Sequence, residues 1–356
     1  MNPKKKLLSK RYEYDRNVTI PSDPWMIELI ENLKIIIHEE EGIFSSNRNC
    51  PLCNHENCTI LSETEHFGLP LTMQICDNCS LLFSKNYFTK EFSKRYYSSI
   101  YNRFKGNKSA EELFQSRTAP SAYSWKRYEY VKSGLGKDFE NISVVMEPGC
   151  NDGCNLYPYF KDDKEVFGCD FDERRIVSGR KEGINIINGG INELLNHGVR
   201  ADLIILSHLI AHIPSLGDFL TSVRNLLKPD GYVYIESPGL RWAVQPDNNV
   251  RAIEGYGTSN NFLSFLQFEF VYVFELETLK MYMEKHGFKL LVGDEVIRSI
   301  FVIDTEWNSD SVHSSSKGLK RGVDVYKYLK KVEKNYLSPQ SSIKQYYNYL
   351  YHSIKS

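Results

Sequence analysis

The sequence has no excess of charge of either sign: 44 Lys and Arg balance 45 Asp and Glu in 356 residues. A chain that grips a phosphate backbone usually carries a basic surplus, so the balance argues against a nucleic-acid partner. No apolar run approaches the roughly 20 residues of a membrane-spanning helix. No apolar segment follows the cations at the N-terminus, so we expect no signal peptide, a cytoplasmic location and no disulfides among the eight cysteines.

The length of 356 residues is enough for about two domains, and 41% hydrophobic residues is typical of a globular protein. We expect a helical segment at 1–45, a cysteine-rich module at 46–85, a helical linker region at 86–139, an α/β domain at 140–305 and a helical extension at 306–356. The first helix should begin at Asp23-Pro24, with Asp23 as N-cap, and end by Gly42.

Strands alternate with helices from about residue 140 onward, which is the pattern of a parallel sheet. Strands are expected at 143–147, 165–170, 184–188, 201–207 and 231–236, a helix at 275–286 and a terminal β-pair at 287–304. A serine-rich linker at 309–317 precedes two short amphipathic helices. Their apolar faces would pack on the core or on a partner subunit; the core is favoured, and a homodimer stays open. These faces are formed by Val325, Leu329, Val332 and Tyr336, and by Ile343, Tyr347, Leu350 and Ile354.

Four cysteines form two CxxC knuckles, Cys50–Cys53 and Cys76–Cys79. Two residues between thiols let both sulfurs reach one metal, and four thiolates make a closed tetrahedral Zn²⁺ site. We therefore expect a structural zinc site, with His55 or Cys58 as possible substitute ligands; four unconnected free thiols are the alternative. Such a metal would stabilise a segment that is too small to fold alone.

The most informative stretch is 143–153, where an apolar run ends in Glu147 and is followed by Gly149 and Gly153. Glycines allow a buried strand to turn sharply while the backbone stays close to a ligand. The stretch is not a P-loop, because Cys154-Asn155 follows Gly153, and it lacks the Gly-x-Gly-x-x-Gly of a dinucleotide site. A second apolar run ends at Asp170, so two carboxylates should meet at the carboxyl edge of the sheet, where α/β proteins bind ligands.

The Glu-x-Gly-x-x-x-Gly spacing resembles motif I of class I S-adenosylmethionine-dependent methyltransferases. Later runs look like further motifs of that family in the same order: Asp170 after the second strand, 188–192 beside adenine, 201–208 as the fourth strand, 209–214 as its Leu-Glu-His-Ile-Pro run and 226–236 as its Leu-Lys-Pro-Gly-Gly turn and fifth strand. The resemblance implies a Rossmann-like, seven-stranded α/β sheet and S-adenosylmethionine as cofactor.

The resemblance also implies roles for single residues. Glu147 would accept from the cofactor's ammonium, Asp170 would bind the ribose diol, and Phe171 and Ile191 would sandwich adenine, although Ile191 is equally suited to core packing. Asp170 could instead cap a helix at 172–182, a role open to Asp172 as well. The remaining cofactor contacts would come from Gly149, Asn151, Gly153, Asn192 and Ser207.

A catalytic base is needed if the acceptor is a hydroxyl, and His208 and His212 follow the fourth strand on the acceptor side. His212 is equally suited to capping or bracing the helix that follows it.

The zinc module ahead of this domain resembles the sugar C-methyltransferases, as do 88–101, 269–279 and 286–288. That family has a Glu-His pair where this chain has Glu269-Phe270, and a further sizeable domain where only about fifty residues remain. We therefore expect O- or N-methylation of a sugar or glycan precursor, such as a nucleotide-sugar or saccharide, in bacterial surface-polysaccharide biosynthesis. The alternatives are a zinc-carrying RNA methyltransferase and a non-catalytic scaffold that keeps the fold.

Overall fold

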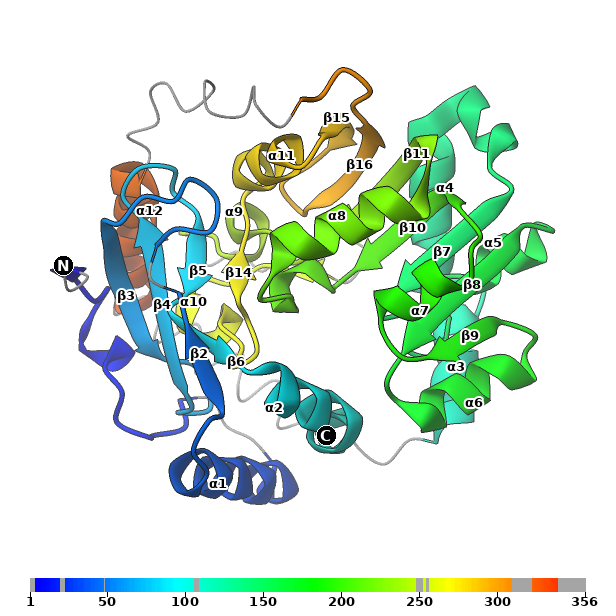
Figure 1. Ribbon diagram of the computed structural model, residues 1–356. Coiled ribbons are helices and arrows are strands. Elements are labelled where there is room, and N and C mark those ends of the chain that lie inside the picture. Colours follow the sequence, from blue (N-terminus) through cyan, green and yellow to red (C-terminus); the bar gives the residue numbers. More distant parts are fainter. Residues whose placement is uncertain are drawn as a thin grey trace.

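The computed structural model describes residues 4–19, 23–47, 49–105, 109–247, 252–253, 256–308 and 322–338. The linker expected at 309–317 and the last amphipathic helix lie outside these residues. The largest element is a seven-stranded sheet with the order β15-β16-β11-β10-β7-β8-β9 (Figure 1). Its strands are β7 (Val144–Pro148), β8 (Glu165–Asp170), β9 (Asn185–Asn188), β10 (Ala201–Ser207), β11 (Leu227–Glu236), β15 (Phe288–Gly293) and β16 (Arg298–Ile303). β16 alone runs in the direction opposite to the other strands of this sheet, so the Rossmann-like fold expected from the sequence is confirmed.

Both faces of this sheet are covered, which explains why the middle of each central strand is apolar. Alternate residues of β10 point to opposite sides. Leu203 and Ile205 pack against α4 (Tyr123–Leu135), α5 (Tyr157–Lys161) and α6 (Glu173–Lys181). Ile204 and Leu206 pack against α7 (Ile191–Asn196), α8 (Leu216–Leu226) and α11 (Leu276–Lys285).

A second sheet is built largely from the cysteine-rich segment, in the order β1-β3-β4-β5-β14. Its last strand, β14 (Tyr272–Val273), lies in the sequence between β11 and β15 of the large sheet and pairs antiparallel with β5 (Leu82–Ser84). The other members are β1 (Lys4–Lys5), β3 (Cys58–Thr64) and β4 (Pro70–Cys76). Lys285 adds a hydrogen bond from its Nζ to the carbonyl of Leu52 at 2.7 Å. The cysteine-rich segment and the large sheet therefore share one core, which Figure 1 shows as adjoining halves.

The N-terminal helix α1 spans Pro24–Glu39, three residues short of Gly42. Asp23 is at the N-cap, as expected, but its side chain makes no capping hydrogen bond. The region from 86 to 135 starts with β6 (Asn86–Phe88), which pairs with β2 (Phe44–Ser46), and is helical afterwards. Its helical pieces are α2 (Lys90–Arg95), a π-helical turn at Tyr96–Ile100, a 3₁₀ turn at Tyr101–Lys105, α3 (Ala110–Thr118) and α4.

The remaining described elements are short, apart from α12 (Gly322–Tyr336). The expected apolar face of this helix does pack on the core, where Val325, Leu329 and Val332 meet Leu8 and Tyr12. The short elements are the 3₁₀ turns Lys10–Tyr12, Gly136–Asn141 and Ile210–His212, the helices α9 (Leu240–Ala243) and α10 (Phe262–Phe265), and the strands β12 (Ala252–Ile253) and β13 (Tyr256–Gly257). Among the described residues, no helix combines the length and hydropathy that crossing a bilayer would take.

Candidate active site and cysteine cluster

The turn after β7 brings the chain tightly against β8. Gly149 and Gly153 both have positive φ, +70° and +76°, and a Cβ on Gly153 would lie 2.8 Å from Cγ2 of Ile184. The amides of Gly149 and Cys150 donate to the carbonyl of Cys169 at 2.8 and 3.0 Å. The glycines are thus required by the backbone conformation and, at Gly153, by the close approach of a neighbouring side chain.

Glu147 is the penultimate residue of β7, next to the turn, and it is almost completely buried, at 1% exposure. Its Oε1 accepts from Nδ2 of Asn155 at 2.7 Å, whereas Oε2 has no hydrogen-bond partner among the described residues. Burial raises the pKa of this carboxyl to about 8. A buried acid with one unsatisfied oxygen is costly, unless a ligand supplies the missing donor.

Asp170 ends β8 on the same edge of the sheet. Its Oδ1 accepts the amides of Phe171 and Asp172 at 2.7 and 2.9 Å, and its Oδ2 accepts the amide of Asn151 at 2.8 Å. Burial raises the pKa of Asp170 against the opposing effect of these amides. The N-cap of α6 is Asp172, which accepts from the amide of Arg174, so Asp170 does not cap this helix. A carboxylate has about four acceptor positions, which leaves Asp170 capacity for a ligand.

The side chains expected around adenine lie next to Asp170. Phe171 is 43% exposed, unusual for so large an apolar ring, and lies beside Gly190 at the start of α7. Ile191 is half-buried against the large core cluster, and Asn192 is exposed. Ser207 ends β10, directly opposite Glu236 of β11. These residues therefore line the same carboxyl edge.

A charged network crosses this edge, and sequence reasoning missed most of it. Arg127 of α4 donates through Nε to Oε1 of Glu236 at 2.7 Å and through Nη1 to Oδ1 of Asn155 at 3.0 Å. Tyr234 donates its hydroxyl to Oε2 of Glu236 at 2.6 Å. Glu236 ends the apolar run of β11, so the rule that pointed to Asp170 would also have found it. Arg127 lies in a helix without a recognisable motif, and no local signal marks it.

The two candidate histidines lie in different surroundings. His208 follows β10 with a φ of +53°, and its Nε2 is 3.4 Å from Oε1 of Glu236, within the charged network. His212 lies in the 3₁₀ turn at Ile210–His212, with Nδ1 3.3 Å from the carbonyl of Glu269 and its ring 5.5 Å from that of Phe270. The N-cap of α8 is Ser215, so His212 does not cap that helix.

His212 lines a pocket between the cysteine-rich half and the large sheet. Aromatic rings make up much of its wall, and one carboxylate residue, Glu269, contributes to it. The ring of Tyr97, from the π-helical turn, meets the ring of His212 edge-on at 6.2 Å. The lining residues are Phe44, Asn86, Tyr87, Phe88, Ser93, His212, Pro214, Phe268, Glu269, Phe270 and Val271.

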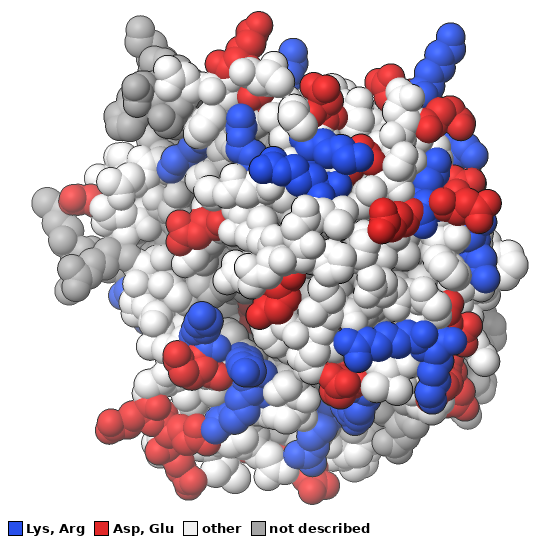
Figure 2. All heavy atoms as spheres, turned by 45° about the vertical axis from the view of Figure 1, so that its right-hand side comes forward, with Lys and Arg blue, Asp and Glu red and all other residues white. Residues whose placement is uncertain are grey.

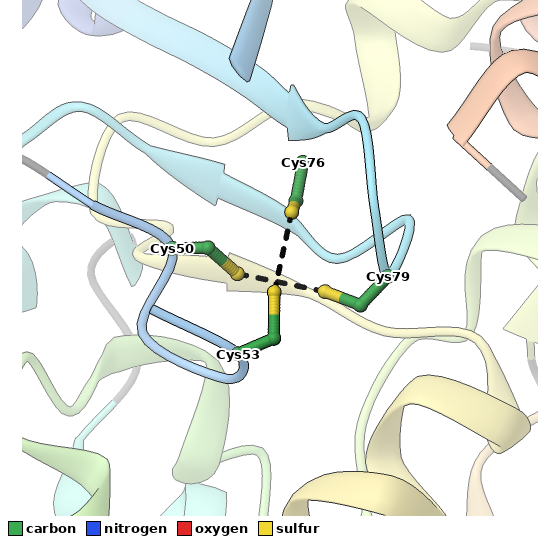
Figure 3. Close-up of side chains that lie close together, drawn as sticks. All are labelled: Cys50, Cys53, Cys76 and Cys79. Carbon is green, nitrogen blue, oxygen red and sulfur yellow. Dashed lines mark hydrogen bonds between the residues drawn. The ribbon is translucent and has the colours of Figure 1, made fainter. Parts of the chain in front are cut away.

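The two CxxC knuckles converge as their spacing predicted. Figure 3 shows Cys50 and Cys53 from the loop before β3 facing Cys76, at the end of β4, and Cys79, in the turn that follows. Their four sulfurs lie within 4.8 Å of one another, with 3.5 Å between Cys50 and Cys79 and between Cys53 and Cys76. A tetrahedral Zn²⁺ with sulfurs at about 2.3 Å requires them about 3.8 Å apart, so this donor set fits the metal.

The two substitute ligands are outside this group. His55 accepts the amide of Asn57 through Nδ1 at 3.1 Å, and Cys58 pairs with Cys76 across the β3–β4 ladder. All the described cysteines are free thiols, without disulfides.

A family model described as a methyltransferase domain matches residues 92–292, more than half of the chain. The chain belongs to this methyltransferase family. No curated protein sequence matches it.

Solved structures that resemble the methyltransferase are distant. A SAM-dependent methyltransferase from Archaeoglobus fulgidus is 19% identical, with a TM-score of 0.37 over 50% of this chain and 73% of that one. Streptomyces venezuelae DesVI is 13% identical, with a TM-score of 0.39 over 54% and 94%. CalS10, a Micromonospora echinaspora amino pentose methyltransferase solved with SAM, is 13% identical, with a TM-score of 0.37 over 61% and 97%. At this distance they carry no argument about the acceptor.

Proposed function

We propose that the methyl donor is S-adenosylmethionine, bound at the carboxyl edge formed by β7, β8 and β10. The observation that carries this proposal is Glu147, whose buried Oε2 lacks a donor at the point where the cofactor's ammonium would lie. An ammonium group would supply both the hydrogen bond and the compensating charge. The resemblance in motif order supports the same placement.

The other residues at this edge would hold the rest of the cofactor. Asp170 would accept from the ribose diol, and the exposed ring of Phe171 would cover adenine opposite Ile191. Gly149 and Gly153 shape the turn, while Asn151, Asn192 and Ser207 lie along the same edge and would supply further cofactor contacts. The sulfonium of the bound cofactor is itself the activated electrophile, so the protein's task is to align the acceptor and exclude water.

We infer that the acceptor is a hydroxyl or amine of a sugar or glycan precursor, such as a nucleotide-sugar of bacterial surface-polysaccharide biosynthesis. The side chains around His212 support this class by their type, because aromatic rings lie beside a few polar groups there. His208 or His212 would remove the acceptor's proton. The sugar C-methyltransferases have a Glu-His pair where this chain has Glu269-Phe270. The ring of His212 lies against Phe270, so an imidazole is still present at this position in space.

We propose a structural Zn²⁺ on Cys50, Cys53, Cys76 and Cys79. Four thiolates would fill its coordination sphere, so it would fold the chain around it and take no part in transfer. An RNA methyltransferase is less well supported, because cations and anions are interspersed on the face shown in Figure 2 and the whole chain has a net charge of −1.

Calorimetry with S-adenosylmethionine tests the donor, followed by a panel of nucleotide-sugars with methyl-labelled donor. We expect binding, its loss by about tenfold or more in Asp170→Ala, and label on at least one sugar. No heat with the intact protein would favour a scaffold. Labelling of RNA, with a steep salt dependence of RNA binding, would favour the RNA enzyme instead.

A further inference from the structure

The charged network contains a buried ion pair that the fold alone does not require. Glu236 is 2% exposed, and Arg127 donates to its Oε1 twice, through Nε at 2.7 Å and through Nη2 at 2.5 Å. Burial acts to raise the pKa of the Glu236 carboxyl, but nearby His208 and this guanidinium together hold it well below its usual range. Apolar residues often stabilise a core as well as a buried ion pair does, so the pair calls for an explanation beyond stability.

The guanidinium of Arg127 also lies between two groups that the proposed function uses. On one side, Nη1 donates to Oδ1 of Asn155, whose Nδ2 donates to Oε1 of Glu147 at 2.7 Å. On the other side, Nη2 lies 3.4 Å from Nε2 of His208. A planar fork can hold several partners in fixed directions at once, which a lysine cannot do.

His208 is itself held in an uncommon conformation. Its φ of +53° is in the left-handed region, and its amide donates to the carbonyl of Glu236 at 2.7 Å. Such backbone strain persists where the surroundings determine the conformation, and it occurs often at functional sites. Glu236 thus fixes His208 twice, through its backbone carbonyl and through the carboxylate 3.4 Å from the imidazole.

We propose that Arg127 and Glu236 are positioning residues, which set the imidazole of His208 relative to the amino-acid end of the cofactor through one continuous chain of contacts, Glu147–Asn155–Arg127–Glu236–His208. This inference rests on the proposed placement of the cofactor at Glu147. It also gives a role to α4, the helix that supplies Arg127. Through Arg127, this helix would fix the position of His208 relative to Glu147.

The test needs no acceptor, because it measures the NMR signal of His208 while a cofactor analogue is bound at Glu147. The probe is S-adenosylhomocysteine, which keeps the amino-acid end, and the readout is the NMR signal of ¹³Cε1-labelled histidine, with His208 assigned by His208→Asn. In the intact protein, saturating S-adenosylhomocysteine should shift the His208 signal. In Arg127→Met the shift should fall by at least half, and affinity should fall about tenfold, because Asn155 and Glu147 lose their anchor. Arg127→Lys should restore the charge but little of the shift.

The matched control is Arg224→Met. Arg224 is half-buried, as Arg127 is, and its guanidinium also makes a hydrogen bond, donating to the carbonyl of Gly287 at 2.7 Å. It takes no part in the charged network. This variant should keep the shift and the affinity. If Arg127→Met folds with both unchanged, the pair is merely structural and the proposal is overturned.

If Arg127→Met does not fold, the near-isosteric Glu236→Gln gives the same readout from the other end of the chain of contacts, and a full shift there overturns the proposal. Failure of the intact protein to bind S-adenosylhomocysteine would refute the donor assignment itself. Binding with indifferent variants would refute the positioning role alone.

Discussion

At the scale of single residues, Glu147 shows how burial prepares a site for a cation. The same burial that raises its pKa to about 8 leaves Oε2 without a donor. In the absence of ligand, native Glu147 keeps its proton above pH 4.5, where an ordinary glutamate ionises, so this residue lowers the stability of the fold as pH rises toward about 8. A bound ammonium reverses this cost, because it stabilises the carboxylate.

We therefore predict that S-adenosylhomocysteine binding releases up to one proton below about pH 8, and that its affinity rises about tenfold per pH unit from pH 6 to pH 8 before levelling off. Calorimetry in buffers of different ionisation enthalpy measures the released proton. Glu147→Gln should bind weakly and without this pH dependence. Equal affinity of the intact protein at pH 6 and pH 8 would contradict the assignment of Glu147 as the ammonium acceptor.

A second prediction at this scale concerns Gly153. Its φ is +76°, and a Cβ added to it would lie only 2.8 Å from Cγ2 of Ile184. Gly153→Ala should lower the free energy of unfolding by about 2–4 kcal/mol, since backbone strain and overpacking add. Gly198 is the control: its φ is +79°, but nothing lies within 4 Å of its Cβ position. Gly198→Ala should cost about 1–2 kcal/mol from strain alone. Urea unfolding compares them, and equal losses would show that the close approach to Ile184 is unimportant.

At the scale of elements, the two CxxC knuckles lie directly beside the strands that join the two halves of the chain. Cys76 is the last residue of β4, and β5 follows the second knuckle and pairs with β14 from the other half of the chain. A metal that fixes the knuckles would thus also fix the strand that joins the two halves.

We predict about one Zn²⁺ per chain by elemental analysis, and a fall in melting temperature after chelation. Cys53→Ser should lose the metal, because it removes one of the four converging thiols. Cys58→Ser is the control: it changes a neighbouring buried thiol outside the group and should retain zinc. Zinc retained by Cys53→Ser but lost from Cys58→Ser would show that the ligand set is different.

At the scale of the whole molecule, the sequence predicted what is local and left out what is distant. Apolar runs separated by turn residues predicted the strands of the large sheet, and the CxxC spacing predicted the cysteine cluster. Each of these signals lies within a few residues of the sequence. The pairing of β14 with β5 joins Tyr272 to Phe83, and Arg127 meets Glu236 across more than a hundred residues. A single sequence does not encode such pairings in any local pattern, so they became visible only in the fold.

The two ends of the described chain supply the last prediction. Glu333 of α12 is 2% exposed and accepts hydrogen bonds from Ser9 at 2.6 Å and from Arg11, through Nε, at 2.8 Å. Removing one member of such a pair leaves a buried charge uncompensated, so Glu333→Gln should lower the free energy of unfolding by about 3 kcal/mol. Arg11→Met with Glu333→Gln should cost less than the two single changes summed.

Urea unfolding of all four proteins gives the coupling, while S-adenosylhomocysteine affinity should stay unchanged because the pair is not part of the carboxyl-edge network. Additive losses would mean that the N-terminal segment and α12 stabilise the fold independently, whereas a coupling of 1 kcal/mol or more, the order seen for contacting pairs, would mean that each holds the other in place.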